Sequence, residues 1–168
     1  MTRPVASTLR WMRLSPLLGA GAVLVACSTS VPFDPPSQAE ARAYVARAIG
    51  LALDGDLEAL CAAGGGNCDE ILEQAGDIPA APPLIVDVFE VPNQRHPDGS
   101  WTLGGQMVEL CGHRDDGSVY RTQMLVFRDN AGRLIAIEPI YWSGIGIIIG
   151  GPPVTTGATP SFDCPLAR

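Results

Sequence analysis

The chain has 168 residues, a net charge of −7 and a hydrophobic content of 46%, enough for a targeting segment and one ordinary domain with a core. All 11 basic residues are arginines against 18 acidic residues, which argues against nucleic-acid binding because that depends on basic patches. The acidity favours solubility and specifies no partner. Fifteen prolines and 19 glycines indicate long loop segments, concentrated toward the two ends of the chain.

The N-terminal segment has the parts of an export signal. Three arginines precede an uncharged run from Leu14 to Ala26, whose 13 residues are too few for a membrane-spanning helix, which needs about 20. We therefore expect residues 1–26 to be a signal peptide that is removed. Its removal takes away three arginines and no acidic residue, so the net charge of the mature chain becomes −10.

The last four residues of this segment, Leu24-Val25-Ala26-Cys27, resemble the bacterial lipobox, in which a signal peptidase cleaves just before the cysteine. The resemblance implies that Cys27 carries a diacylglyceryl thioether, with or without an N-acyl chain. Each buried CH₂ adds roughly 0.8 kcal/mol of membrane affinity, so two or three chains anchor a protein stably. An ordinary secretory signal with an incidental cysteine is the alternative. Residues 27–36 are rich in Ser and Pro and predict a short lipidated tether on the extracytoplasmic face of the bacterial cell membrane.

The first half of the mature chain has helical spacing. Ser37-Gln38-Ala39-Glu40 is a capping-box pattern, and the apolar residues that follow recur on one side of a helix that Gly55 can end. Asp56 can cap a second short helix, and Asn67 can open a third. A cluster of prolines then ends the helical half.

The second half has the pattern of strands joined by hairpin turns. The strand candidates are PLIVDVFEVP (83–92), WTLGGQMVELCGH (101–113), VYRTQMLVF (119–127) and RLIAIEPIYW (133–142). The turns between them are HPDGS, RDDGS and RDNAG. Gly104-Gly105 predicts a bulge or bend inside the second strand. We therefore expect residues 37–142 to form an α+β domain in which N-terminal helices pack on a strongly curved antiparallel sheet.

The helical opening AYVARAIGLALDGDLEALC, followed by a bent sheet, resembles the nuclear transport factor 2-like (cystatin-like) cone fold. The step at Gly55-Asp56 matches the family's common break between helices 1 and 2. The stretch VFRDNAGRLIAIEPIYWSG most resembles the end of a strand in actinobacterial envelope lipoproteins of this fold. The molecular role of those lipoproteins is generally undefined. The resemblance implies a cone-shaped domain, and by analogy with this fold a homodimer formed through the exposed sheet face.

Four cysteines remain once Cys27 is assigned to lipid, an even number that indicates disulfides in an exported chain. Three pairings are possible. We favour Cys61 with Cys68, because they flank the flexible loop AAGGGN, and Cys111 with Cys164, because this pair ties the Gly/Pro-rich tail of residues 143–168 to the sheet. The close spacing of a metal site is absent, so we expect neither a metal ion nor another cofactor.

Enzymes that resemble this fold place an acid/base residue in the pocket. The candidates here are Asp87, Glu109, His113 and Glu138, with Tyr44, Tyr120 and Tyr141 as hydroxyl donors. None falls in a known catalytic motif, and His113 is expected to be a solvated turn residue. Glu138, Tyr44 and Glu109 are the residues we assign to a possible pocket.

These observations favour a non-catalytic, membrane-anchored lipoprotein that binds a small apolar ligand or a partner protein of the cell envelope. The alternative is a small-molecule enzyme of isomerase or cyclase type that uses a pocket carboxylate. The apolar run from Ile145 to Ile149 predicts an extra edge strand or a strip packed on the sheet, with a partner-binding surface as the alternative.

Overall fold

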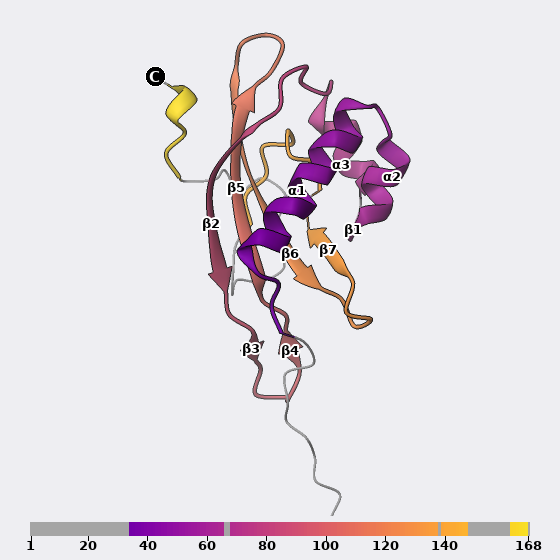
Figure 1. Cartoon of the computed structure of the whole chain (residues 1–168), viewed down its shortest axis with the longest axis vertical. Helices are drawn as coiled ribbons and strands as arrows, with labels where there is room; N and C mark the ends of the chain where they lie inside the picture. Colours follow the sequence, from indigo (N-terminus) through magenta and orange to yellow (C-terminus); the bar gives the residue numbers. More distant parts are fainter. Residues whose placement is uncertain (1–33, 66–67, 138, 148–161, 168) are drawn as a thin grey trace, which may run out of the picture. The chain divides into compact units, whose positions relative to one another are not determined.

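Three helices pack on a five-stranded mixed sheet in the computed structural model (Figure 1). The structure describes residues 34–65, 68–137, 139–147 and 162–167. The expected signal peptide, the lipidation site Cys27 and the pocket candidate Glu138 lie outside these residues. The α+β class predicted from the sequence is therefore confirmed for the described part of the chain.

Helix α1 (Gln38–Leu53) begins at the predicted capping box. The Ser37 hydroxyl accepts a hydrogen bond from the Glu40 backbone N–H at 3.2 Å, and a Glu40 carboxylate oxygen accepts one from the Ser37 backbone N–H at 2.8 Å. The buried residues of α1 are mostly small and lie on one face: Ala41, Tyr44, Val45, Ala48 and Ala52. This face is the one that packs on the sheet.

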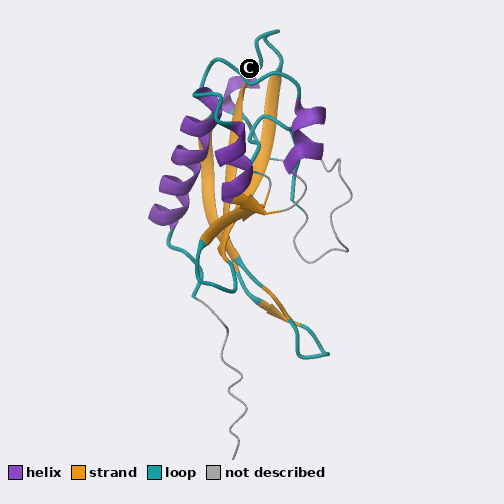
Figure 2. Ribbon diagram, turned by 90° about the vertical axis from the view of Figure 1, so that its right-hand side faces the viewer, coloured by secondary structure: helices purple, strands orange, loops and turns teal. Residues whose placement is uncertain are grey.

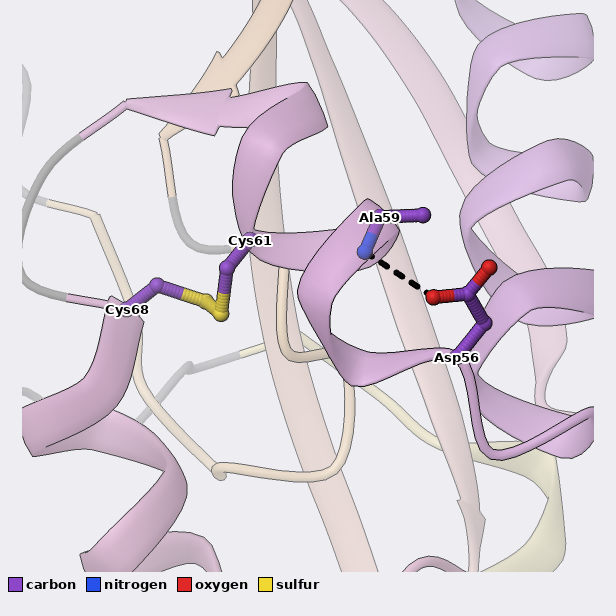
Figure 3. Close-up of a disulfide and its surroundings, with 4 residues drawn as sticks. All are labelled: Asp56, Ala59, Cys61 and Cys68. Carbon is purple, nitrogen blue, oxygen red and sulfur yellow. Dashed lines mark hydrogen bonds between the residues drawn. A yellow bond between two sulfur atoms is a disulfide. The ribbon is translucent and has the colours of Figure 1, made fainter.

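The break after α1 and the cap of the next helix also follow the prediction. Gly55 has a positive φ of 76°, a conformation that favours glycine, and only Asp56 separates it from helix α2 (Leu57–Ala63). A carboxylate oxygen of Asp56 accepts a hydrogen bond from the Ala59 N–H, which caps α2 (Figure 3). Helix α3 (Cys68–Ala75) follows, and Asn67, which was expected to open it, lies outside the described residues.

The main sheet has the strand order β1-β7-β6-β5-β2. The strands are β1 (Gly64–Gly65), β2 (Leu84–Val91), β5 (Gly105–His113), β6 (Val119–Arg128) and β7 (Leu134–Ile137). All neighbouring pairs are antiparallel except β1, which lies parallel to β7. The expectation of a purely antiparallel sheet is therefore wrong, because Gly64–Gly65 pairs with β7 and is not only a flexible loop. A Cβ atom at Gly64 would collide with the ring of Pro139, so only glycine fits there.

The sheet is also not strongly curled, contrary to the expectation of a strongly curved cone (Figure 2). Gly104 and Gly105 were expected to bend one long strand, but they lie where the chain passes between two sheets. Before them, β4 (Trp101–Thr102) pairs with β3 (Gln94–Arg95) in a separate two-stranded ribbon. The change of direction thus falls between the ribbon and β5, and the main sheet does not need to bend at this point.

Strand β7 is shorter than the predicted segment of residues 133–142. It ends at Ile137, and Pro139, which lacks a backbone N–H for a sheet ladder, follows soon after. The chain then turns into the core, where Tyr141 and Trp142 are both fully buried. The indole N–H of Trp142 donates a hydrogen bond to the Gly76 carbonyl at 3.2 Å, which ties this turn to the end of α3.

The two faces of the sheet belong to different apolar clusters. Side chains of all three α-helices share the larger cluster with Val108, Leu110, Met124 and Val126 from the central strands. The alternating residues Met107 and Leu125 belong to a smaller cluster on the opposite face, with Val91. No helix in the described part of the chain is long and apolar enough to cross a membrane.

Both predicted disulfides are present. Cys61 and Cys68 join α2 to the start of α3, with Cα atoms 5.4 Å apart (Figure 3). Cys111 on β5 joins Cys164, with Cα atoms 6.1 Å apart, and so fixes the 3-10 helix η1 (Pro165–Ala167) to the sheet. Two disulfides are typical of a protein that folds in an oxidising compartment outside the cytoplasm.

Candidate functional site

A cleft of about 760 Å³ lies between helix α1 and the start of strand β7, and we refer to it as the α1–β7 cleft. Its volume falls within the range of small-ligand sites. Three segments line it: Glu40, Ala43, Tyr44 and Arg47 from α1; Ala62, Ala63 and Gly64 from the junction of α2 and β1; and Arg133, Leu134 and Ile135 from the start of β7.

One helical face supplies the first wall. The four α1 residues have the spacing i, i+3, i+4 and i+7, which places them on one side of a helix. Tyr44 is buried, and its hydroxyl donates a hydrogen bond to the Ala63 carbonyl. Burial raises the pKa of Tyr44, so the phenol stays neutral and protonated at physiological pH. Tyr44 therefore fixes α1 to the end of α2 and gives the cleft a rigid floor.

Two ion pairs surround the cleft. Glu40 accepts from Arg128 at 2.6 Å, and Arg133 donates to Asp129 at 2.7 Å. Hydrogen bonds from Ser37 and then from Arg128 hold the pKa of Glu40 below its usual value. The hydrogen bonds of Arg133 likewise lower the pKa of Asp129. Both carboxylates are therefore ionised and engaged at neutral pH.

Arg47 is the cation at the opposite end of the helical wall. Neither ion pair in the described part of the chain includes it, and its guanidinium carbon lies 5.6 Å from the centre of the Tyr44 ring. The cleft is thus lined by one carboxylate and two guanidinium groups, and its net charge is positive although the whole chain carries −7. This distribution favours a ligand that carries negative charge.

A smaller recess of about 430 Å³ lies beside the other end of β6, between the hairpin before β6 and the turn after Trp142. Arg114 lines it, but its guanidinium donates to the Trp142 carbonyl at 2.9 Å and lies 5.6 Å from the centre of the Tyr120 ring. These contacts give Arg114 a structural role. We therefore regard the α1–β7 cleft as the better candidate site.

The structure does not bring the three predicted pocket residues together. Tyr44 lines the α1–β7 cleft, but Glu109 lies on the face of the sheet opposite α1, where it accepts a hydrogen bond from the Gln123 amide at 2.9 Å. Glu138 lies outside the described residues. The sequence could not reveal this separation, because alternation along β5 gives opposite faces without saying which face the helices cover.

The remaining acid/base candidates are distributed over the surface and the core. Asp87 and His113 are exposed, as expected for His113. Tyr120 and Tyr141 are buried with ring centres 6.3 Å apart, and burial raises the pKa of Tyr141 to about 12 and that of Tyr120 further. These tyrosines remain neutral core residues at physiological pH. Among the described residues, no group of three His, Cys, Asp or Glu side chains is placed to hold a metal ion.

The apolar run that begins at Ile145 does lie along the sheet, next to β6. The Gln123 N–H donates to the Ile145 carbonyl at 3.0 Å, and Ile147 packs on the smaller apolar cluster. This confirms the prediction of a strip packed on the sheet for residues 145–147, while residues 148 and 149 lie outside the described part.

Comparisons of the chain with family models, curated proteins and solved structures returned no match. The site therefore depends on geometry alone. The roles of Arg47, Arg133 and Leu134 could not be predicted from the sequence, because these residues form no motif. The spacing of Arg47 three residues after Tyr44 was the one visible signal. Residues 133–135 come beside α1 through tertiary packing, since Leu134 pairs with Arg128, which in turn binds Glu40.

Proposed function

We propose that the protein is a lipid-anchored, extracytoplasmic binding protein that takes its ligand in the α1–β7 cleft and catalyses no reaction. The lipobox-like motif at Cys27 supports the anchor, and the two disulfides agree with an extracytoplasmic location. The helices-first order and the Gly55-Asp56 break support kinship with the nuclear transport factor 2-like domains, in a less curled form.

The hydrogen bonds made by the polar groups of the cleft favour a binding role over a catalytic one. The Tyr44 hydroxyl is bonded to the Ala63 carbonyl, and both carboxylate oxygens of Glu40 are taken, one by Ser37 and one by Arg128. Groups held in this way stabilise the fold and are poorly placed to exchange protons with a substrate. The guanidinium group of Arg47 is a hydrogen-bond donor without an acceptor, so it suits the binding of anions.

The anchor is tested by metabolic labelling with an alkyne fatty acid in cells that express the full chain. The wild type and a Ser28→Ala control should incorporate label and fractionate with the membrane. Cys27→Ala should lose both properties, because it lacks the thiol to which the lipid is attached. Equal labelling and membrane retention of Cys27→Ala would refute the anchor.

The cleft is tested by filling it. Ala43 is exposed on the cleft wall, whereas Ala46 is exposed on α1 but does not line the cleft. Native mass spectrometry of protein released from membranes should detect a bound ligand on the wild type and on Ala46→Trp, and none on Ala43→Trp. Retention of the ligand by Ala43→Trp would place binding elsewhere on the protein.

A further inference from the structure

The edges of the main sheet differ in how their backbone groups are protected. At the outer strand β2, the Val88 N–H donates to a carboxylate oxygen of Asp87 at 2.8 Å, and the Val88 carbonyl accepts from the Gln38 amide at 3.0 Å. Both backbone groups that a further strand would need at Val88 are therefore occupied by side chains. This is a means of protecting an edge strand from pairing with another chain.

The part of β6 that extends past β7 is covered in another way. The Ile145 carbonyl accepts from the Gln123 N–H at 3.0 Å and from the Thr122 hydroxyl at 2.9 Å. The Ile147 N–H donates to the Gln123 side chain at 3.0 Å. The segment after the Trp142 turn thus occupies this stretch of the sheet.

None of the described residues provides such a cover at the start of β7. The Asp129 N–H donates to the Arg133 carbonyl, so these two residues are a hydrogen-bonded pair. Along an antiparallel ladder, hydrogen-bonded and non-hydrogen-bonded pairs alternate, so the next hydrogen-bonded pair is Phe127 with Ile135. The backbone N–H and C=O of Leu134, between them, consequently point away from β6. Within the described part of the chain, strand β1 pairs with Ala136 and Ile137 and does not reach Leu134, because the chain before Gly64 is already helical (Figure 1).

Leu134, whose outward backbone groups have no partner among the described residues, lines the α1–β7 cleft. The cleft therefore combines a position on the sheet edge that can pair with one more strand, at Leu134, with Arg47 on α1 and Arg133 directly before β7. Extended peptides bind such edges through main-chain hydrogen bonds, while side-chain contacts supply specificity. Arginine favours carboxylates for the second role, because its planar guanidinium can bind both oxygens at once.

We propose that the α1–β7 cleft receives an extended acidic segment of a partner protein, which adds a short strand beside Leu134 and places a carboxylate against Arg47. This inference depends on the proposed function, since it names the ligand class of the same cleft. At the β2 edge, Asp87 and Gln38 already occupy the backbone groups of Val88, so a further strand cannot bond to this residue.

The probe is a fluorescent, end-blocked hexapeptide of sequence Val-Asp-Val-Glu-Val-Asp, titrated with the mature lipidated protein in nanodiscs at physiological ionic strength. Two matched peptides separate the two parts of the interaction. In one, alternate backbone amides are N-methylated, which removes strand donors and keeps the charge. In the other, lysines replace the acidic residues. We expect the anisotropy to report saturable binding of the probe and at least about tenfold weaker binding of both matched peptides.

Protein variants locate the interaction. Arg47→Glu should weaken binding of the acidic probe about tenfold, whereas Arg42→Glu, which makes the same charge change on α1 away from the cleft, should change it less than about twofold. Ala43→Trp should abolish binding, and Ala46→Trp should retain it. All these variants change exposed residues, so folding is expected to survive.

Several results would overturn the inference: no saturable binding of the acidic probe, undiminished binding of the N-methylated peptide, or equal effects of Arg47→Glu and Arg42→Glu. These failures remain distinguishable from failure of the proposed function, which is decided by lipid labelling of Cys27 and by the ligand that Ala43→Trp displaces.

Discussion

Removing the disulfide between Cys111 and Cys164 should destabilise the domain more than removing the one between Cys61 and Cys68. The first bond closes a loop with a sequence separation of 53, and the second a loop with a separation of 7. The chain-entropy relation for an unfolded chain gives about 4 kcal/mol for the long loop and about 2 kcal/mol for the short one at 25 °C. The expected difference in the free energy of unfolding is therefore about 2 kcal/mol.

Urea denaturation of the two double Cys→Ala variants measures this difference, in a Cys27→Ala background that keeps the anchor out of the experiment. Fluorescence of the buried Trp142 can report unfolding. We take the free energy of unfolding to fall by about 2 kcal/mol per M urea. The urea midpoint should then fall by about 2 M when the Cys111–Cys164 disulfide is removed and by about 1 M when the Cys61–Cys68 disulfide is removed. Equal shifts, or a larger shift for the Cys61 and Cys68 pair, would refute the loop-length reasoning and imply residual structure in the unfolded chain.

Three further predictions concern single residues. Hydrogen bonds from Ser37, and then the ion pair with Arg128, hold the pKa of Glu40 below 4.5. The ionised Glu40 therefore stabilises the fold above pH 4.5, and this contribution is lost as the pH falls further. Glu40→Gln should flatten this acid decline in urea midpoints measured at a series of pH values, and an unchanged decline would assign it to other carboxylates. Trp142→Phe should lower the free energy of unfolding in urea by about 2 kcal/mol, because it leaves a small cavity and an unpaired Gly76 carbonyl. Trp101→Phe on the ribbon should lower it by under about 0.5 kcal/mol. Equal losses would contradict the burial argument. Gly112→Ala should lower stability by about 1–3 kcal/mol, since the added methyl group meets the Tyr120 ring, and a midpoint equal to wild type would show that this ring moves freely.

Local features of this fold could be predicted from the sequence. The α1 cap at Ser37, the break at Gly55 and the α2 cap at Asp56 depend on short-range chemistry, so their patterns were sufficient. The hairpin turns and the two disulfides followed for a similar reason. Turn residues and cysteine spacing restrict which segments can meet.

The candidate site could not be predicted in this way. Gly64 and Gly65 have no strand propensity, and they form β1 only because α2 delivers them to the edge of β7. The cleft exists because that pairing stops short of Leu134. A contact between residues 40–47 and residues 133–135 depends on the tertiary arrangement, and no local motif encodes it.

The pocket candidates show the same limit. Glu109 lies on the face of the sheet away from Tyr44, and this placement depends on which side of the sheet the helices cover. The strong curvature inferred from the Gly104-Gly105 pair failed because those glycines serve a junction between two sheets. Glycine patterns indicate that the chain changes direction, and packing decides where the change is used.

The central claim is that this chain is anchored by a lipid on Cys27 and presents its domain for binding outside the cytoplasm. Mass spectrometry of tryptic peptides from membrane-isolated protein tests it most directly. If Cys27 carries the lipid anchor, the N-terminal peptide should span Cys27–Arg42 and carry a diacylglyceryl group on the cysteine. An unmodified N-terminus at another residue, or an intact segment of residues 1–26, would contradict it.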